Sequence, residues 1–255
     1  HQSPLVAQRH ESLLQRIQER KAEPPFWGYR RIWASLRFVG QRAVNKQRVL
    51  RLMRAPHLLG KPQRALRAKR TPTGSKPRPT KPNAWWGIAM TKLLVEDGGG
   101  VYIVVVLDWS TKKIVGDYAG TPCTARHWRA ALDRAVSRQF PEGVRDHGLS
   151  LMSDNGCQPT AQAFMKACSR LGIRQAFTSD HNPKGNADTE RLMRTRQEEC
   201  LWLSEWTSPV GLMRALDAWI ADYNEQYLHS TLGYQSPRQF ERDSHFSHGT
   251  PFVAA

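Results

Sequence analysis

The chain has 255 residues, 40% of them hydrophobic, and a formal net charge of +16 at pH 7. This length suits two domains, and no apolar run is long enough to cross a membrane. No secretory signal pattern stands at the start. The four cysteines match neither a zinc pattern nor a Cys-x-x-Cys motif, which favours reduced thiols in a cytosolic protein.

The positive charge is concentrated in the first third of the chain. Residues 1–82 hold 20 Lys plus Arg against 3 Glu, whereas residues 83–255 hold 18 against 19 acids. This distribution is typical of a nucleic-acid-binding region joined to a near-neutral second domain. A basic tail that only aids solubility is the alternative. The sequence disfavours it, because the basic residues alternate with apolar ones at helical spacing.

Three short helices are predicted within residues 1–59, at 11–21, 28–38 and 45–54. Gly40 ends the second helix, and Asn45 suits the N-cap of the third. Two short helices joined by a tight turn with glycine form a helix-turn-helix, which predicts a basic DNA-binding region. Three-helix modules also bind proteins, so the motif alone leaves both functions open.

The third helix would lie in a major groove, with its basic side chains on phosphates. Residues 60–82 are rich in Pro, Lys, Arg and Thr and have no apolar period, so they predict an extended basic linker. The residues predicted to contact DNA in these two regions are Arg30, Arg31, Lys46, Gln47, Arg48, Arg51, Arg54, Lys69 and Arg70.

The pattern after the linker is α/β. It predicts strands and helices in the order β-β-β-α-β-α-β-α, at 86–96, 101–110, 113–120, 125–140, 149–154, 160–172, 173–179 and 189–203. This is the order of a ribonuclease-H-like domain, the fold of integrase catalytic cores. We therefore predict such a domain over residues 83–245, preceded by the all-α region and followed by a tail at 246–255.

Two acids in this domain are candidates for metal-dependent chemistry. In "LSLMSDNG", residues 149–156, Asp154 stands where a short apolar run ends. It either shapes a turn there or acts as a carboxylate at a strand end. Glu190 begins the helix after the fifth strand, with 35 residues between it and Asp154. The first strand would supply a third acid to the same edge, but its middle residue is Ala89 and no acid lies between Asn83 and Glu96.

Six segments together resemble the DDE transposases of bacterial insertion sequences with two overlapping reading frames, and more distantly retroviral integrases. They are "GYRRIWASL", "VNKQRVLRLM", "NAWWGIAMTK", "LMSDNG", "NPKGNADTERLMRT" and "YNEQYLHSTLGYQSPRQF", and they cover most of residues 25–242. The resemblance implies that the three catalytic acids fall at position 89, Asp154 and Glu190. Ala89 therefore replaces the first aspartate, either by deliberate substitution, which the intact remaining motifs favour, or in a naturally inactive copy.

The resemblance also implies two Mg²⁺ ions, replaceable by Mn²⁺, with Asp154 on one ion, Glu190 on the other and an aspartate at 89 bridging them. Asp108 is the nearest other acid, and Asp188 is better explained as a helix N-terminal charge. Gln197 stands where the family usually carries Lys. The same helix predicts three further DNA contacts, Arg191, Arg194 and Arg196. Trp85 and Trp86 suit the core better than base stacking, and His181 and His229 suit the surface.

The implied function is transposition: binding of the element's terminal inverted repeats, then metal-dependent strand cleavage and transfer, by a homodimer or higher oligomer holding element ends and target DNA. A bacterial cytoplasmic, nucleoid-associated protein is expected, with a further DNA-binding region upstream of His1. The absence of cysteine before Cys123 excludes the His/His/Cys/Cys zinc domain of retroviral integrases. The alternative is a non-catalytic repressor or architectural factor, which Ala89 favours and Asp154 and Glu190 disfavour.

Overall fold

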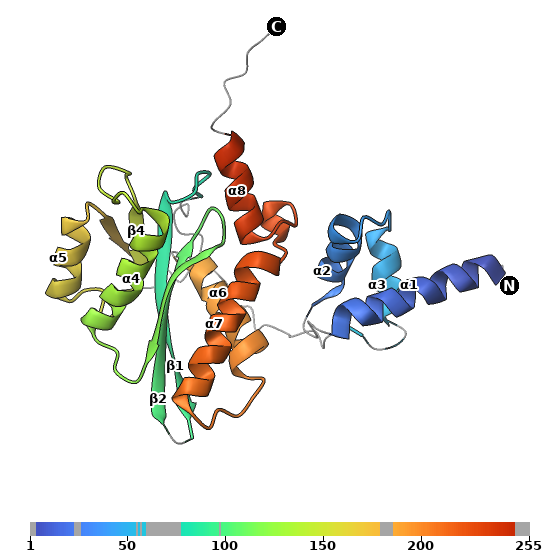
Figure 1. Cartoon of the computed structure of the whole chain (residues 1–255), viewed down its shortest axis with the longest axis horizontal. Coiled ribbons are helices and arrows are strands. Elements are labelled where there is room, and N and C mark those ends of the chain that lie inside the picture. Colours follow the sequence, from blue (N-terminus) through green and yellow to red (C-terminus); the bar gives the residue numbers. More distant parts are fainter. Residues whose placement is uncertain are drawn as a thin grey trace, which may run out of the picture. The chain divides into compact units, whose positions relative to one another are not determined.

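The computed structural model describes residues 4–22, 27–54, 56, 58–59, 78–96, 98–178 and 186–247. The chain divides into two compact units, one of residues 1–71 with 228–235 and one of residues 72–227 with 236–255 (Figure 1). The division between 71 and 72 falls inside the predicted linker. In the described ranges, no helix is both long and apolar enough to span a bilayer.

The smaller unit is helical, as predicted. Its elements are α1 (Pro4–Ala22), α2 (Tyr29–Ala34), the π-helical turn η1 (Ser35–Val39) and α3 (Lys46–Arg54). The second predicted helix is therefore an α-helix that widens into a π-turn, and the first begins seven residues earlier than expected. The buried apolar residues of these helices form one core: Leu13, Ile17, Ile32, Leu36, Val49 and Met53.

Local hydrogen bonds fix the turn between α2 and α3. Asn45 accepts a hydrogen bond from the backbone N–H of Gln47 at 2.7 Å, which confirms it as the cap of α3. Trp33 Nε1 donates to the carbonyl of Val44 at 2.8 Å and so ties α2 to the residues before α3. These bonds hold the two helices of the predicted helix-turn-helix together.

Residues 228–235 belong to the smaller unit, which the predicted boundaries did not anticipate. The Tyr234 ring stacks on Phe38 with centroids 5.9 Å apart and meets Trp33 edge-on at 5.3 Å. The ammonium of Lys46 lies 4.5 Å from the centroid of the Trp33 ring. Lys46 therefore contacts an aromatic cluster of its own unit through a cation–π interaction.

The larger unit is built on a five-stranded sheet in the order β3-β2-β1-β4-β5. The strands are β1 (Trp85–Val95), β2 (Gly99–Asp108), β3 (Ile114–Gly120), β4 (Ser150–Ser153) and β5 (Arg174–Phe177). The first three form the predicted antiparallel meander, and β4 and β5 pair in parallel with their neighbours. This is the predicted ribonuclease-H-like sheet, with strand ends within two residues of the prediction.

Helices cover both faces of this sheet (Figure 1). The helices of this unit are α4 (Ala125–Gln139), α5 (Gln162–Arg170), α6 (Ala187–Arg196) with the π-turn η2 (Gln197–Leu201), α7 (Pro209–Gln226) and α8 (Pro237–Ser247). The short η3 (Ser230–Leu232) lies in the segment 228–235 of the smaller unit. One core lies between the sheet and α4–α5, and the other lies between the sheet and α6–α7. Strand β1 alternates between them: Trp86 and Ile88 belong to the first, whereas Trp85 and Ala89 pack on the second.

Strand β3 is an edge of the sheet, and α7 covers its start. The side-chain amide of Asn224 accepts from the backbone N–H of Ile114 at 2.9 Å and donates to its carbonyl at 3.0 Å. One side chain thus pairs both backbone groups of an edge residue, as a neighbouring strand would. Asn224 lies in the segment "YNEQYLHSTLGYQSPRQF", where its role was not predicted.

Candidate active site and DNA-contact residues

Strands β1 and β4 lie side by side just before position 89 and Asp154. Strands β1 and β4 pair in parallel, with Trp85 opposite Ser150 and Gly87 opposite Met152. Continuing that register by two residues sets Ala89 beside Asp154, directly after β4 ends. Ala89 and Met152 both pack on the core shared with α6 and α7, so the alternation places residues 89 and 154 on the face that α6 covers.

Asp154 also shapes the turn that follows β4. Its Oδ1 accepts from the backbone N–H of Gly156 at 3.1 Å, and Asn155 Nδ2 donates to the carbonyl of Thr178 at 2.9 Å. The turn role and the strand-end position therefore coexist in one residue. Asp154 is exposed, so its carboxylate remains open to solvent and to a ligand.

Glu190 stands in the first turn of α6, exposed, with its backbone N–H donating to the carbonyl of Asn186 at 3.0 Å. Helix α6 lies close to β1 at Gly87, where an added Cβ would lie 2.0 Å from Thr189 Oγ1 and 2.5 Å from Trp109 Nε1. Only glycine leaves room for this approach. It brings the turn that carries Glu190 against the strand that carries position 89.

The donor set fits a divalent cation in part. Asp154 and Glu190 supply the carboxylate oxygens that Mg²⁺ and Mn²⁺ prefer, but the third position offers only the methyl group of Ala89. Across the residues that the structure describes, no three His, Cys, Asp or Glu side chains are grouped to hold a metal ion. The set is one carboxylate short of the three that the resemblance implies.

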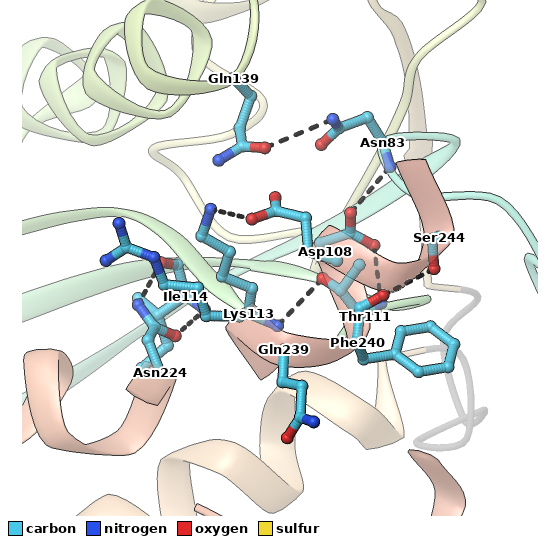
Figure 2. A network of polar contacts seen from close by, with 12 residues as sticks. Asn83, Asp108, Thr111, Lys113, Ile114, Gln139, Asn224, Gln239, Phe240 and Ser244 are labelled. Carbon is cyan, nitrogen blue, oxygen red and sulfur yellow. Dashed lines mark hydrogen bonds and ion pairs between the residues drawn. The ribbon is translucent and has the colours of Figure 1, made fainter. Parts of the chain in front are cut away.

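Asp108 does not complete the set. It lies opposite Trp86 in the β1–β2 register, three residues along from the pairing of Ala89 with Val105. It is 1% exposed and accepts hydrogen bonds from the backbone N–H groups of Asn83, Ser110 and Thr111. Figure 2 shows the bond from Asn83. Its carboxylate therefore fixes the turn between β2 and β3, which the strand-end position alone could not reveal.

Burial raises the pKa of Asp108 to about 6, against the lowering effect of its three backbone donors. A carboxyl whose pKa is higher in the folded than in the unfolded state contributes most below pH 4 and loses that contribution as pH rises through 6. We expect the free energy of unfolding to fall by up to about 3 kcal/mol from this group between pH 4 and 7. Asp108→Asn should remove this dependence of the free energy of unfolding on pH. Urea titrations across this range measure it, and an unchanged slope in the variant would contradict the assignment.

Asp188, in the first turn of α6, forms an ion pair with Lys112 at 3.1 Å. This position agrees with its prediction as a helix N-terminal acid. Gln197, where a lysine was expected from the resemblance, donates from Nε2 to Thr91 Oγ1 at 3.3 Å. The first contact joins α6 to the β2–β3 turn, and the second joins η2 to β1.

The three arginines of α6 differ in exposure. Arg191 and Arg194 are exposed, but Arg196 is 0% exposed, so its prediction as a DNA contact is wrong. Within the described residues, none of its three guanidinium nitrogens has a hydrogen-bond partner. Burial lowers the pKa of Arg196 to about 10, which still leaves it protonated at neutral pH. A charged group thus lies among apolar neighbours of the α6–α7 core.

The predicted DNA contacts of the smaller unit lie mainly on α3. A shallow depression on this helix is lined by Asn45, Gln47, Arg48, Leu50, Arg51 and Arg54. Gln47, Arg51 and Arg54 are exposed, and Lys46 is directed to Trp33. The remaining predicted contacts divide by placement: Arg30 is exposed, Arg31 is half-buried, and Lys69 and Arg70, like His181, lie outside the described residues.

The two tryptophans at the start of β1 are structural. Trp86 is fully buried, and Trp85 stacks on Trp109 with ring centroids 5.7 Å apart. The guanidinium of Arg174 covers the Trp85 ring at 5.7 Å. This confirms core packing rather than base stacking for both residues.

Models of known protein families match residues in both units. Two models described as integrase core domain match residues 79–183 and 171–237, and one described as HTH-like domain matches residues 8–65. The chain is 29% identical to a 31.7 kDa uncharacterized protein of insertion element IS407 from Burkholderia multivorans, over 91% of this chain and 81% of that protein. It is 28% identical to transposase InsD for insertion element IS2D from Escherichia coli K12, over 90% and 78%.

Among solved structures, a chain of the simian T-cell lymphotropic virus intasome, in complex with the PP2A regulatory subunit B56 gamma, superposes with a TM-score of 0.52. It is 17% identical, and the match covers 87% of this chain and 76% of that one, which shows a shared fold. The integrase core matches run from residue 79 to residue 237 and the relatives extend over most of the chain. The chain therefore belongs to the DDE transposases of bacterial insertion sequences, which are related to retroviral integrases.

Proposed function

We propose that this transposase binds the terminal inverted repeats of its element through the basic helical unit and acts on the DNA strands at the edge formed by position 89, Asp154 and Glu190. The observation that supports the proposal is the parallel β1–β4 register, in which Gly87 lies opposite Met152. Continued by two residues, this register would set position 89 beside Asp154 on the face covered by α6. With Ala89 present, we infer that the chain binds DNA without cleaving it.

The proposed roles follow from residue chemistry. Divalent Mg²⁺ or Mn²⁺, when bound, would activate a water or 3′ hydroxyl and neutralise the leaving oxygen. Asp154 and Glu190 would each hold one ion, and an aspartate at 89 would bridge both. Arg191 and Arg194, exposed one and four residues after Glu190, would contact DNA phosphates beside the site.

Two element ends must meet for transposition, so we propose that the chain acts as a homodimer or higher oligomer on element and target DNA. Its proposed location is the bacterial cytoplasm, at the nucleoid.

The second candidate function is a non-catalytic DNA-binding protein, which Ala89 favours. Strand cleavage after Ala89→Asp would support the transposase proposal, and absence of metal-dependent cleavage in that variant would favour the second candidate.

DNA affinity is expected to fall steeply with salt. If the basic unit neutralises about six phosphates, log affinity should fall with log salt at a slope of about −5. Arg51→Ala and Arg54→Ala should each reduce that slope by about 1 on any duplex, whereas Gln47→Ala should cost about 1–3 kcal/mol only on end DNA if it reads a base. Fluorescence anisotropy between 50 and 200 mM salt measures these changes.

The matched control is Arg214→Ala, an exposed arginine on α7 outside the predicted contacts. It should change neither the salt dependence of DNA affinity nor the preference for end DNA. Equal losses on end and random duplexes for all three α3 variants would reduce α3 to a non-specific contact. Unchanged binding in all three would contradict its role altogether.

A further inference from the structure

The first turn of α6 is joined to the sheet by side chains on three of its residues. Asn186 Nδ2 donates to the carbonyl of Ile88 at 3.2 Å, and Thr189 Oγ1 accepts from Trp109 Nε1 at 3.1 Å. Between them, Asp188 pairs with Lys112 of the β2–β3 turn. The turn that carries Glu190 is therefore fixed on its sheet side, while Glu190 itself remains exposed.

Asn186 is the unusual member of this set. It is the N-cap residue of α6, yet its side chain caps no backbone N–H of the helix. Asparagine is favoured at this position because its oxygen normally accepts such a bond. Here the amide is 4% exposed, turns to β1 instead, and leaves Oδ1 buried with no hydrogen bond from any described residue. An unmet buried acceptor costs stability, so the geometry serves something other than helix capping.

The hydrogen bond from Asn186 to Ile88 connects α6, which carries Glu190, to β1, which carries position 89. Ile88, whose carbonyl Asn186 binds, immediately precedes position 89 on β1. The carbonyl of Asn186 in turn accepts the backbone N–H of Glu190. One residue thus bonds to the neighbour of position 89 and to Glu190, across a close approach that only Gly87 allows.

We propose that Asn186 is a positioning residue of the site, which sets the separation between position 89 and Glu190 and so the spacing of the metal ligands. This role rests on the proposed function. It acts through the backbone, and Asn186 itself touches neither metal nor DNA. Groups that orient metal ligands from behind typically contribute 10–100-fold to metal affinity, and misplacement of a reacting group by about 1 Å can cost 100-fold in rate.

The test compares Mn²⁺ affinity, measured by titration calorimetry, in the full chain carrying Ala89→Asp with and without Asn186→Leu. Leucine has a similar size but cannot donate a hydrogen bond to the carbonyl of Ile88. We expect the affinity to fall by about 10–100-fold, while affinity for end DNA stays unchanged. Asn186→Ser gives the same expected loss, and serine is a good N-cap that keeps α6 folded.

The matched control is Asn224→Leu in the same background. Asn224 also joins a helix to a strand backbone, but at the β3 edge. It should lower the melting temperature and leave Mn²⁺ affinity unchanged. If Ala89→Asp binds Mn²⁺ no better than the chain with Ala89, the proposed function is contradicted. If it binds and Asn186→Leu leaves the affinity intact, only the role of Asn186 is overturned.

Discussion

Replacing Ala89 by aspartate is expected to convert the chain from a DNA-binding protein into a metal-dependent nuclease and strand-transfer enzyme. The new carboxylate would stand beside Asp154 and against the first turn of α6. With Asp154 and Glu190, this carboxylate would hold the metal, and a bound metal would supply several kcal/mol of transition-state stabilisation, which corresponds to a rate increase of at least about 10³-fold. The measurement is cleavage of labelled end DNA with and without Mg²⁺ or Mn²⁺.

The controls follow from the same geometry. Asp154→Asn or Glu190→Gln in the Ala89→Asp background should return cleavage to the level of the chain with Ala89. DNA affinity should change little in all these proteins, because the excess positive charge lies in residues 1–82. Without metal, Ala89→Asp should lower stability, since it adds a half-buried carboxylate near two others. Full metal-dependent cleavage by the chain with Ala89 would show that position 89 is not a ligand.

Replacing Arg196 by methionine is expected to stabilise the larger unit. A buried guanidinium without partners retains the cost of leaving water and gains nothing in return. Methionine is unbranched, follows a similar path and suits irregular core space. We expect a gain of about 1–4 kcal/mol in the free energy of unfolding, or a rise of roughly 5–10 °C in the melting temperature. Chemical denaturation and calorimetry measure both.

Arg194→Met is the matched control, because Arg194 lies two residues earlier on the same helix and is exposed. The free energy of unfolding of the Arg194→Met protein should stay within about 0.5 kcal/mol of that of the parent chain. A loss of stability in Arg196→Met would mean that Arg196 is paired with a group outside the described ranges. In that case the guanidinium would be a structural ion and not an uncompensated charge.

The case of Arg196 also shows how periodicity and residue type can disagree. Thr189, Leu192, Met193 and Arg196 recur at spacings of three and four, which places all four on one helical face. The first three are buried, so the spacing alone pointed Arg196 inward. Its charge and its place on the helix of Glu190 suggested DNA contact instead. The helical pattern was the better guide at this residue.

Strands and helices of the larger unit were predictable because each alternates or repeats over a local window. The resemblance alone predicted that position 89 and Asp154 belong to one site, since register between β1 and β4 depends on the whole sheet. The bonds of Asn186 to Ile88 and of Trp109 to Thr189 join residues 98 and 80 positions apart. No local pattern carries such information.

The covering of the β3 edge limits how copies of this sheet can join. Asn224 occupies both backbone groups of Ile114, and Arg134 donates to the carbonyl of Asp117 further along the strand. An incoming strand would have to displace both side chains before forming its own ladder. Continuation of the sheet from one subunit into the next is therefore disfavoured on this side, so a multimer built by strand addition would have to grow from β5, the opposite edge.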